Sequence, residues 1–291
     1  MLILTFPDYL PQSQNLAAKL DVPLVQISLH HFPDNESLVR LPASLPEHVI
    51  ICRSLNQPNT KLIELLLCAK TARQLGAQRL TLVVPYLCYM RQDIANQPGE
   101  AVSQRIIGSL LAELFDDVIT VDPHLHRIST LNEAIPLANA ISVSASGVIG
   151  QFIKNQLDNA VLLGPDSESR QWVASLAQKI GFDYVIAEKI RRGDRQVDIT
   201  LPHGEYQGRT VIIIDDMAST GRTLANTARL LHQAGAGEIY AVVTHALFCD
   251  DAEAHIRVAG IKTIWSTDSI SHTTASIKLD GLLADTINSI I

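Results

Sequence analysis

Two adjacent carboxylates, Asp215 and Asp216, end a run of four β-forming residues at 211–214. A short loop of Ser, Thr and Gly follows them, and residues 224–234 then carry apolar side chains at helical spacing until Gly235. A strand, a loop and a helix in this order point backbone N–H groups and the positive helix end at one place, which suits a phosphate. The carboxylates could accept hydrogen bonds from sugar hydroxyls. The pattern therefore predicts a sugar-phosphate site; the alternative is that the two acids only cap the helix.

The one concentrated basic stretch lies at 188–195 and includes Lys189 and Arg191. A solvated loop is the ordinary interpretation of such residues. This stretch, however, follows a predicted strand and precedes 197–201, which has the pattern of a β-flap. Cations in such a place would neutralise charge on transferring phosphoryl groups, since that chemistry depends mainly on positioning and electrostatics.

Two further polar positions follow predicted strands. His124 and His126 are two residues apart beyond a strand, so both could point to one face. From chemistry alone such a pair is more often structural than metal-binding. Asp166 stands between a strand and a helix, where the neighbouring Ser167 could serve as the N-cap.

Composition excludes several classes of protein. A chain of 291 residues, 47% hydrophobic and 18% charged, is expected to form two globular domains. A net charge of −7 argues against general nucleic-acid binding, and no apolar run reaches membrane-spanning length. The N-terminus lacks a basic region and is predicted to be a first strand, not a signal peptide. Four cysteines without zinc spacing indicate reduced thiols in a cytoplasmic protein.

Strands and helices alternate along the chain, which predicts an α/β fold with mainly parallel sheets. A polar stretch after Asp122 places the domain boundary near 141–146, giving domains 1–143 and 144–291. The predicted strands are 2–6, 24–27, 49–52, 80–84, 118–121, 161–163, 184–187, 211–214, 239–243 and 263–265. Predicted helices lie at about 13–20, 60–75, 104–114, 167–180, 223–233 and 252–258.

The two halves share a sequence pattern. A helix end, Gly-Ala, a short turn and a strand occur at Gly76 and again at Gly235, 159 residues later. This repetition suggests two similar folds in tandem, although chance similarity between common α/β patterns is an alternative. The same offset carries Asp215 and Asp216 onto Asn56 and Gln57. We therefore expect only the second half to hold a sugar phosphate.

The stretch 211–223 resembles the phosphoribosyl diphosphate (PRPP) motif of type I phosphoribosyltransferases and ribose-phosphate diphosphokinases. The resemblance implies a ribose 5-phosphate site, with one departure, because many members carry a further Asp where this chain has Ser219. The residues that this motif assigns to ribose 5-phosphate are Asp215, Asp216, Ser219, Thr220, Gly221, Arg222 and Thr223.

Motifs in the first half are similar to the diphosphokinases alone. Residues 32–36 match a Phe-x-Asp-x-Glu loop, which in that family reaches a neighbouring subunit and holds the adenine of ATP. Residues 85–93 match Pro-Tyr-x-x-Tyr-x-Arg-Gln-Asp, which contacts ATP there; the alternative for Arg91 is an ion pair with Asp93. An Asp-x-His match places His124 near the metal–ATP complex. The ATP-binding residues so implied are Phe32, Asp34, Glu36, Arg91, Gln92, Asp93 and His124.

The same resemblance completes the expected site. It implies Mg²⁺ near His124 and Asp166, and a catalytic loop with Lys189 and Arg191. The expected fold is two tandem phosphoribosyltransferase-like (Rossmann-like) domains, in a homo-oligomer. The expected reaction makes PRPP and AMP from ATP and ribose 5-phosphate. A non-catalytic regulatory homologue and a PRPP-using phosphoribosyltransferase remain the alternatives, and Ser219 with the altered 167–168 loop favours the former.

Overall fold

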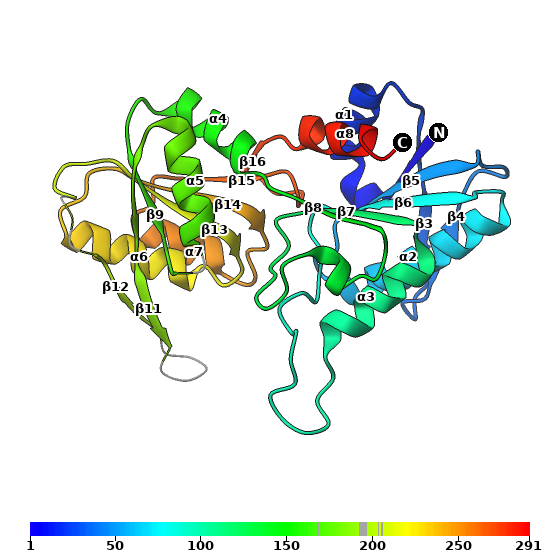
Figure 1. Cartoon of the computed structure of the whole chain (residues 1–291), viewed down its shortest axis with the longest axis horizontal. Coiled ribbons are helices and arrows are strands. Elements are labelled where there is room, and N and C mark those ends of the chain that lie inside the picture. Colours follow the sequence, from blue (N-terminus) through cyan, green and yellow to red (C-terminus); the bar gives the residue numbers. More distant parts are fainter. Residues whose placement is uncertain (168, 192–196, 203, 205) are drawn as a thin grey trace. The chain divides into compact units, whose positions relative to one another are not determined.

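The predicted alternation of strands and helices produces two parallel β-sheets of six strands each (Figure 1). The structure, a computed structural model, describes residues 1–291 except 168, 192–196, 203 and 205. Two compact units divide the chain, and each contains one of these sheets. Within the described residues, no helix is both long and apolar enough to cross a membrane.

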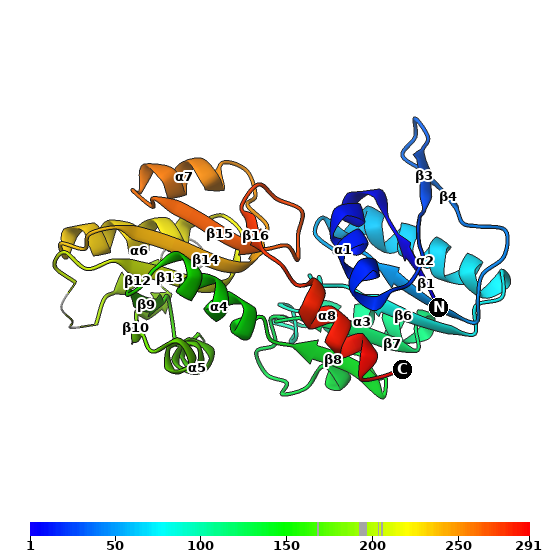
Figure 2. The ribbon, with the colours of Figure 1, turned by 90° about the horizontal axis from the view of Figure 1, so that it is seen from above.

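The sheet of the first unit has the order β2-β1-β5-β6-β7-β8, and neighbouring strands are parallel throughout. Its helices are α1 (Leu10–Leu20), α2 (Pro58–Gln74), α3 (Ser103–Leu114) and α8 (Asp280–Asn288). Figures 1 and 2 show α1 and α8 on one face of the sheet and α2 and α3 on the other. The strands are β1 (Leu2–Thr5), β2 (Leu24–Gln26), β5 (His48–Cys52), β6 (Arg79–Val83), β7 (Asp117–Val121) and β8 (Asn139–Val143).

The sheet of the second unit repeats this arrangement with the order β10-β9-β13-β14-β15-β16. In Figures 1 and 2, α4 (Ser146–Gln156) and α5 (Arg170–Ile180) cover one face, and α6 (Arg222–Gln233) and α7 (Ala252–Val258) cover the other. The strands are β9 (Val161–Gly164), β10 (Asp183–Ile186), β13 (Val211–Ala218), β14 (Ile239–Ala246), β15 (Thr263–Thr267) and β16 (Ala275–Ile277).

Each unit also carries an antiparallel hairpin outside its main sheet. In the first unit, β3 (Ser28–His31) pairs with β4 (Ser37–Arg40). In the second, β11 (Glu188–Arg191) pairs with β12 (Val197–Thr200), so the expected strand at 197–201 is present. The first hairpin was not expected from the sequence, because its strands have only four residues each and mix polar with apolar side chains.

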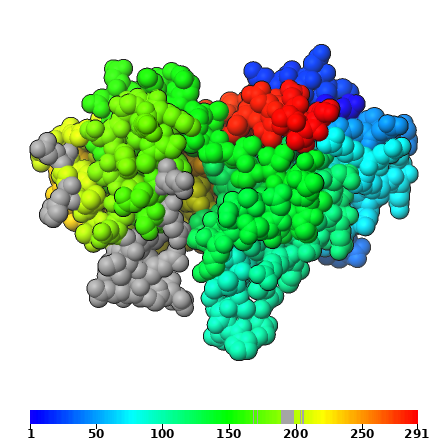
Figure 3. Space-filling view, viewed as in Figure 1, coloured from blue at the N-terminus to red at the C-terminus, as the bar shows by residue number. Residues whose placement is uncertain are grey.

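Residues distant in sequence complete the first unit. It comprises Met1–Ser144, Ser269–Ser271 and Leu279–Ile291, and the second unit comprises Ala145–Asp268 and His272–Lys278. Helix α8 packs on α1, and Figure 3 shows these two ends of the chain side by side on the surface. The backbone carbonyl of Ile290 also accepts a hydrogen bond of 2.9 Å from Arg79 Nη2. The sequence placed residues 279–291 in the second domain, whereas their contacts place them in the first unit.

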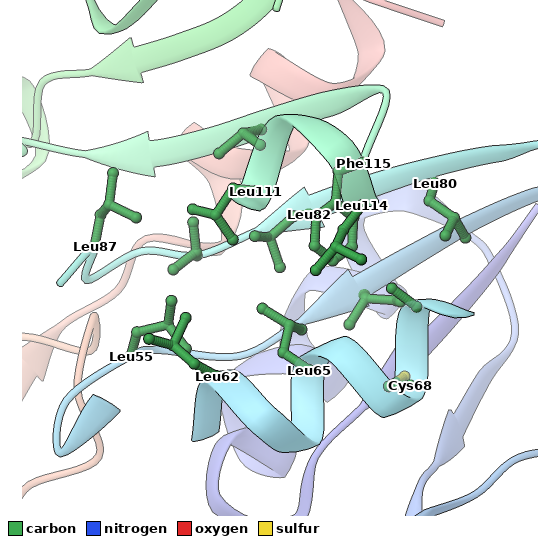
Figure 4. Close-up of a cluster of buried hydrophobic side chains, with 14 of the residues drawn as sticks. Leu55, Leu62, Leu65, Cys68, Leu80, Leu82, Leu87, Leu111, Leu114 and Phe115 are labelled. Atoms are coloured by element: carbon green, nitrogen blue, oxygen red, sulfur yellow. The ribbon is translucent and has the colours of Figure 1, made fainter. Parts of the chain in front are cut away.

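An apolar core joins α2 and α3 to the first sheet (Figure 4). Leu62 and Leu65 project from α2 toward Leu82, and Leu111 projects from α3. Burying a leucine side chain of this kind contributes about 1.5–3 kcal/mol. Cys68 lies in the same core, and burial raises its pKa to about 12. The four cysteines are free thiols; three are buried as expected, whereas Cys249 is exposed.

Strand register corrects the comparison of the two halves. Leu80 and Ile239 are 159 residues apart and occupy the same place in β6 and β14. Their partners, however, are Val49 and Val211, which are 162 residues apart. The counterparts of Asp215 and Asp216 are therefore Arg53 and Ser54, not Asn56 and Gln57. The difference arises because the first unit has three more residues between these paired positions, and its helix α2 is longer than α6.

Candidate functional site

Three loops of the second unit leave neighbouring strands at the carboxyl edge of its sheet. Strand β9 lies between β10 and β13, and all three are parallel. From β9 the chain moves to β10 on one side, and from β13 it moves to β14 on the other. The crevice between the carboxyl ends of β9 and β13 is therefore a topological switch point, where open α/β sheets bind ligands.

Asp215 and Asp216 lie within β13, not after it. The sequence predicted that the strand would end at residue 214, but pairing with β14 continues through Met217 and Ala218. Pairing with β9 ends at Ile213, so it is the ladder with β14 that outweighs the low strand preference of aspartate. Both carboxylates are half-buried, and Asp215 Oδ1 accepts a hydrogen bond of 3.0 Å from the backbone N–H of Asp216.

Gly221 makes the turn into α6 possible. Its φ of +67° lies in the left-handed region. A Cβ at this position would lie 2.8 Å from Ile256 Cδ1 and 3.0 Å from the carbonyl oxygen of Ala252. The backbone can therefore approach α7 only because residue 221 has no side chain.

Ser219 is held by the segment that follows β14. Its carbonyl accepts a hydrogen bond of 2.9 Å from the backbone N–H of Cys249, and its Oγ lies 3.5 Å from Cys249 Sγ. The carbonyl of Ala218 accepts two more, from Leu247 and Phe248. The loop before α6 is thus fixed by backbone bonds that do not depend on the side chain at 219.

The amino end of α6 suits an anion. This helix has twelve residues, and in the described part of the chain no side chain caps its first turn. Its first N–H groups therefore remain available to a ligand, and the helix dipole favours negative charge there. Thr220 and Arg222 are exposed at this end, and Thr223 is half-buried. The arrangement fits a phosphate group.

Asp166 and the basic hairpin leave the same sheet edge. Asp166 follows β9, and its Oδ1 accepts a hydrogen bond of 3.3 Å from the backbone N–H of Ser169. Ser169 is the N-cap residue of α5, so the expectation for Ser167 is wrong by two residues, while Glu168 lies outside the described residues. Lys189 and Arg191 lie on β11, paired with Ile199 and Val197 of β12.

The donor atoms at this edge fit Mg²⁺. Carboxylate oxygens from Asp166, Asp215 and Asp216 are the hard ligands that this ion prefers. Among the residues that the structure describes, no three acidic, histidine or cysteine side chains form a ready-made cage. Mg²⁺ does not require one, because it keeps several waters and uses substrate phosphates as ligands.

In the first unit, the 85–93 motif follows β6. The last two residues of the motif, Gln92 and Asp93, fix it in place. Gln92 accepts a hydrogen bond of 2.6 Å from Ser103 Oγ, at the start of α3. Asp93 is buried and forms an ion pair of 2.6 Å with Arg127. The alternative that Arg91 pairs with Asp93 is therefore wrong; Arg91 is exposed, and Asp93 anchors the loop.

His124 and His126 face each other beyond β7. Their Nε2 atoms lie 2.6 Å apart, and their ring planes are nearly perpendicular. The expectation that both point to one place is confirmed. Because β6 and β7 are parallel neighbours, His124 and Arg91 leave the same edge of the sheet.

The structure separates Phe32 from these residues within the first unit. The β3–β4 hairpin follows β2, and β1 and β5 lie between β2 and β6 in the sheet. Phe32 is 41% exposed at the turn. Its ring makes an edge-to-face contact with the ring of His30. Asp34 and Glu36 are exposed beside it. The separation agrees with a role for this turn toward a neighbouring subunit, as the resemblance implies.

A pocket in the first unit was missed by reasoning from the sequence. It encloses about 420 Å³ at the switch point between β1 and β5. Lys61 Nζ lies 2.6 Å from Asp8 Oδ2, and Arg53 Nη1 lies 2.6 Å from Glu64 Oε2. Lys61 and Glu64, opposite charges three residues apart among the apolar residues 62–67 of α2, were the available signal. The polar lining residues include Asp8, Tyr9, Arg53, Ser54, Asn56 and Lys61.

Comparisons with known proteins match the chain over nearly its whole length. Residues 1–114 match the family model for the N-terminal domain of ribose phosphate pyrophosphokinase, and 138–276 match that for the phosphoribosyl transferase domain. The chain is 31% identical to the ribose-phosphate pyrophosphokinase of Methanopyrus kandleri, covering 100% of this chain and 99% of that protein. Identity to the enzyme of the same name from Saccharolobus solfataricus is 34%, over 89% of each.

A solved structure has the same fold. The phosphoribosylpyrophosphate synthetase of Mycobacterium smegmatis superimposes with a TM-score of 0.83, covering 99% of this chain and 98% of that one. Its sequence identity is 23%, so this match concerns the fold. Together with the family models, it confirms two phosphoribosyltransferase-like domains.

Proposed function

The chain belongs to the family of ribose-phosphate pyrophosphokinases, and we infer that it transfers the pyrophosphoryl group of Mg–ATP to O1 of ribose 5-phosphate. The products are PRPP and AMP. In this reaction the anomeric hydroxyl attacks the β-phosphorus, the bond between the α,β-bridging oxygen and that phosphorus breaks, and AMP leaves. The hydroxyl proton passes to solvent, since no side chain is assigned as a general base.

The second unit supplies the ribose 5-phosphate site in this proposal. Asp215 and Asp216 would accept hydrogen bonds from the ribose hydroxyls. Backbone N–H groups of residues 219–222 and the hydroxyls of Thr220 and Thr223 would hold the 5-phosphate at the start of α6. The observation that carries this assignment is the gathering of these carboxylates and the uncapped end of α6 at the carboxyl edge of β13.

Charge on the reacting phosphates would be neutralised from the neighbouring strands. Lys189 and Arg191, on the hairpin after β10, would stabilise the charge that develops during transfer. Asp166 and His124 would hold Mg²⁺, which when bound neutralises phosphate charge and orients the pyrophosphoryl group. The Nε2 atom of His124 lies 2.6 Å from that of His126, so His124 would contact the ion while next to a second imidazole.

ATP would be recognised mainly by the first unit. Arg91 and Gln92 would contact the nucleotide, Phe32 would stack on its base, and Asp34 and Glu36 would accept from it. Asp93 was also predicted to bind ATP. Because it is buried, we assign it to stabilising this loop. The exposed Phe32 turn supports assembly into a homo-oligomer, and we place the enzyme in the cytoplasm.

The direct experiment incubates the protein with ATP, Mg²⁺ and ribose 5-phosphate and measures PRPP and AMP by mass spectrometry. Equal amounts of both products are expected. Lys189→Ala should abolish turnover with little change in ribose 5-phosphate binding measured by calorimetry. Consumption of PRPP with a base, without formation of AMP, would indicate a phosphoribosyltransferase instead. Binding of ribose 5-phosphate without any turnover would favour the regulatory homologue, which Ser219 and the altered 167–168 loop support.

A further inference from the structure

One buried carboxylate, Glu64 on α2, is bonded to both strands of the β3–β4 hairpin. Its side chain is 1% exposed. Oε1 lies 2.6 Å from His31 Nε2 and accepts a hydrogen bond of 2.9 Å from Ser37 Oγ. His31 ends β3, Ser37 begins β4, and the two residues pair across the hairpin. A single oxygen atom therefore fixes both ends of the 32–36 turn.

The second oxygen of Glu64 is fixed from the sheet. Oε2 accepts from Arg53 Nη1 at 2.6 Å, and Arg53 follows β5. The Arg53 guanidinium is itself held, because its Cζ lies 3.9 Å from the centre of the Phe6 ring and its Nε lies 3.3 Å from Asp8 Oδ1. The carboxylate is thus tied to the end of β5, a central strand of the sheet.

Glu64 is ionised in this setting. Burial acts to raise the pKa of its carboxyl, but the hydrogen bonds from His31, Arg53 and Ser37 outweigh it and hold the pKa below its usual range. Hydrogen bonds to an ionised acceptor are roughly twice as strong as neutral ones. The hairpin is therefore held by charge-assisted contacts at the base of the turn.

The turn itself is ordered by its own backbone. The N–H of Phe32 donates to the carbonyl of Glu36 at 2.8 Å, and the N–H of Asn35 donates to the carbonyl of Phe32 at 2.9 Å. Asn35 has a φ of +69°. These bonds fix the shape of the turn but not its direction, which depends on how β3 and β4 are attached to the unit.

We propose that Glu64 is a positioning residue for the 32–36 turn: it aims Phe32, Asp34 and Glu36 at the nucleotide without contacting the nucleotide itself. This inference rests on the proposed role of the turn in ATP binding. A residue that only stabilised the fold would affect both substrates alike. A positioning residue affects the substrate that the turn contacts.

The central test compares Glu64→Gln with Glu113→Gln, the same chemical change at an exposed position on α3. In Glu64→Gln, the KM for ATP is expected to rise about tenfold, corresponding to one or two hydrogen bonds. The KM for ribose 5-phosphate should change less than twofold, and Glu113→Gln should change neither. Hydrogen exchange of the 32–36 amides should become faster only in Glu64→Gln. An equal rise in both KM values, or no change in either, would overturn the proposal.

Two more variants separate the possible failures. Ser37→Ala removes one bond to Oε1 without leaving a buried charge, and it should raise the KM for ATP about threefold; if Glu64→Gln does not fold, this variant decides. In a Phe32→Ala background, Glu64→Gln should raise that KM less than it does in the wild type, because only Asp34 and Glu36 then remain to be positioned. If Phe32→Ala alone changes nothing, the nucleotide role of the turn fails and the positioning role falls with it. If Phe32→Ala raises the KM but the Glu64 and Ser37 variants do not, only the positioning role fails.

Discussion

Arg53 of the first unit stands at the strand position that Asp215 occupies in the second unit. Each residue follows four buried residues of a central strand, yet one is a cation and the other an acid. Two sheets of the same topology therefore present opposite charges at corresponding switch points. This exchange explains why only the second unit is expected to bind sugar hydroxyls.

Removing either acid should weaken ribose 5-phosphate binding. In Asp215→Asn and Asp216→Asn, the KM for ribose 5-phosphate is expected to rise about 10- to 100-fold, since a hydrogen bond to a charged group is worth about 1.5–3 kcal/mol. The KM for ATP should change much less. Steady-state kinetics with each substrate varied provides the measurement. Asp158→Asn, at an exposed site of the second unit, is the control and should leave both constants unchanged.

Gly221→Ala should damage the phosphate loop. The added methyl group would meet Ile256 and Ala252, and the positive φ disfavours it further. We expect a loss of about 1–3 kcal/mol in the free energy of unfolding, measured by urea denaturation, together with weaker ribose 5-phosphate binding. Gly147→Ala is the matched control, because a methyl group there meets nothing within 4 Å. Equal stability of the two variants would contradict this account of the turn.

Asp117 should make stability depend on pH at the acidic end. Burial acts to raise the pKa of this carboxyl, but hydrogen bonds from Arg79, Asn139 and Thr81 outweigh it and hold the pKa below its usual 3.8. A depressed pKa stabilises the folded state above the unfolded pKa, and this stability is lost as pH falls through the folded pKa. Asp117→Asn should therefore cost about 1.5–3 kcal/mol at pH 7, the value of a hydrogen bond to a charged group, because its partner Arg79 is 33% exposed.

The pH series of urea unfolding provides the check for Asp117. The difference between wild type and Asp117→Asn should stay constant from pH 7 to pH 5 and shrink only below about pH 4. If this difference in unfolding free energy grew on acidification, the pKa of Asp117 could not be lowered by folding.

Cys249 should be the thiol that reacts first. Cys52, Cys68 and Cys88 are buried, and burial raises the pKa of each to about 12, which leaves almost no thiolate at neutral pH. Cys249 is exposed beside Ser219. Ellman's reagent is expected to modify one thiol per chain rapidly, and ribose 5-phosphate should slow this reaction. A fast phase that persists in Cys249→Ser would contradict the assignment.

Apolar runs in the sequence predicted most of the strands and helices. The elements that were missed lack such a run or depend on distant contacts. Strands such as β5 and β13 are buried on both faces, so their continuous apolar residues were visible in the sequence. Strand β8 is an edge strand in which only Ala140 is buried, and its mixed pattern was read as a domain boundary. Helix α8 was also missed, because its place is decided by packing on α1 and not by its own sequence.

The residues of the candidate site likewise fall into those that the sequence predicted and those that it did not. Asp166, Asp215 and the 189–191 pair could be gathered from the sequence, because the carboxyl ends of parallel strands share one edge. The contact of Glu64 with His31 joins residues 33 positions apart on different elements. No local pattern encodes such a contact. The offset of 159 pointed to Asn56 instead of Arg53 because α2 is longer than α6.

The return of the chain to its first unit has a consequence for synthesis. Ser54 Oγ donates to the carbonyl of Ser269, and α8 packs on α1 only once residues 280–288 exist. Although most of the first unit is translated before residue 145, it lacks these contacts until the ribosome has passed the whole second unit. The second unit, whose last segment (His272–Lys278) includes β16, is complete at residue 278 and can reach its final structure earlier. The half that is made first is therefore the half that finishes folding last.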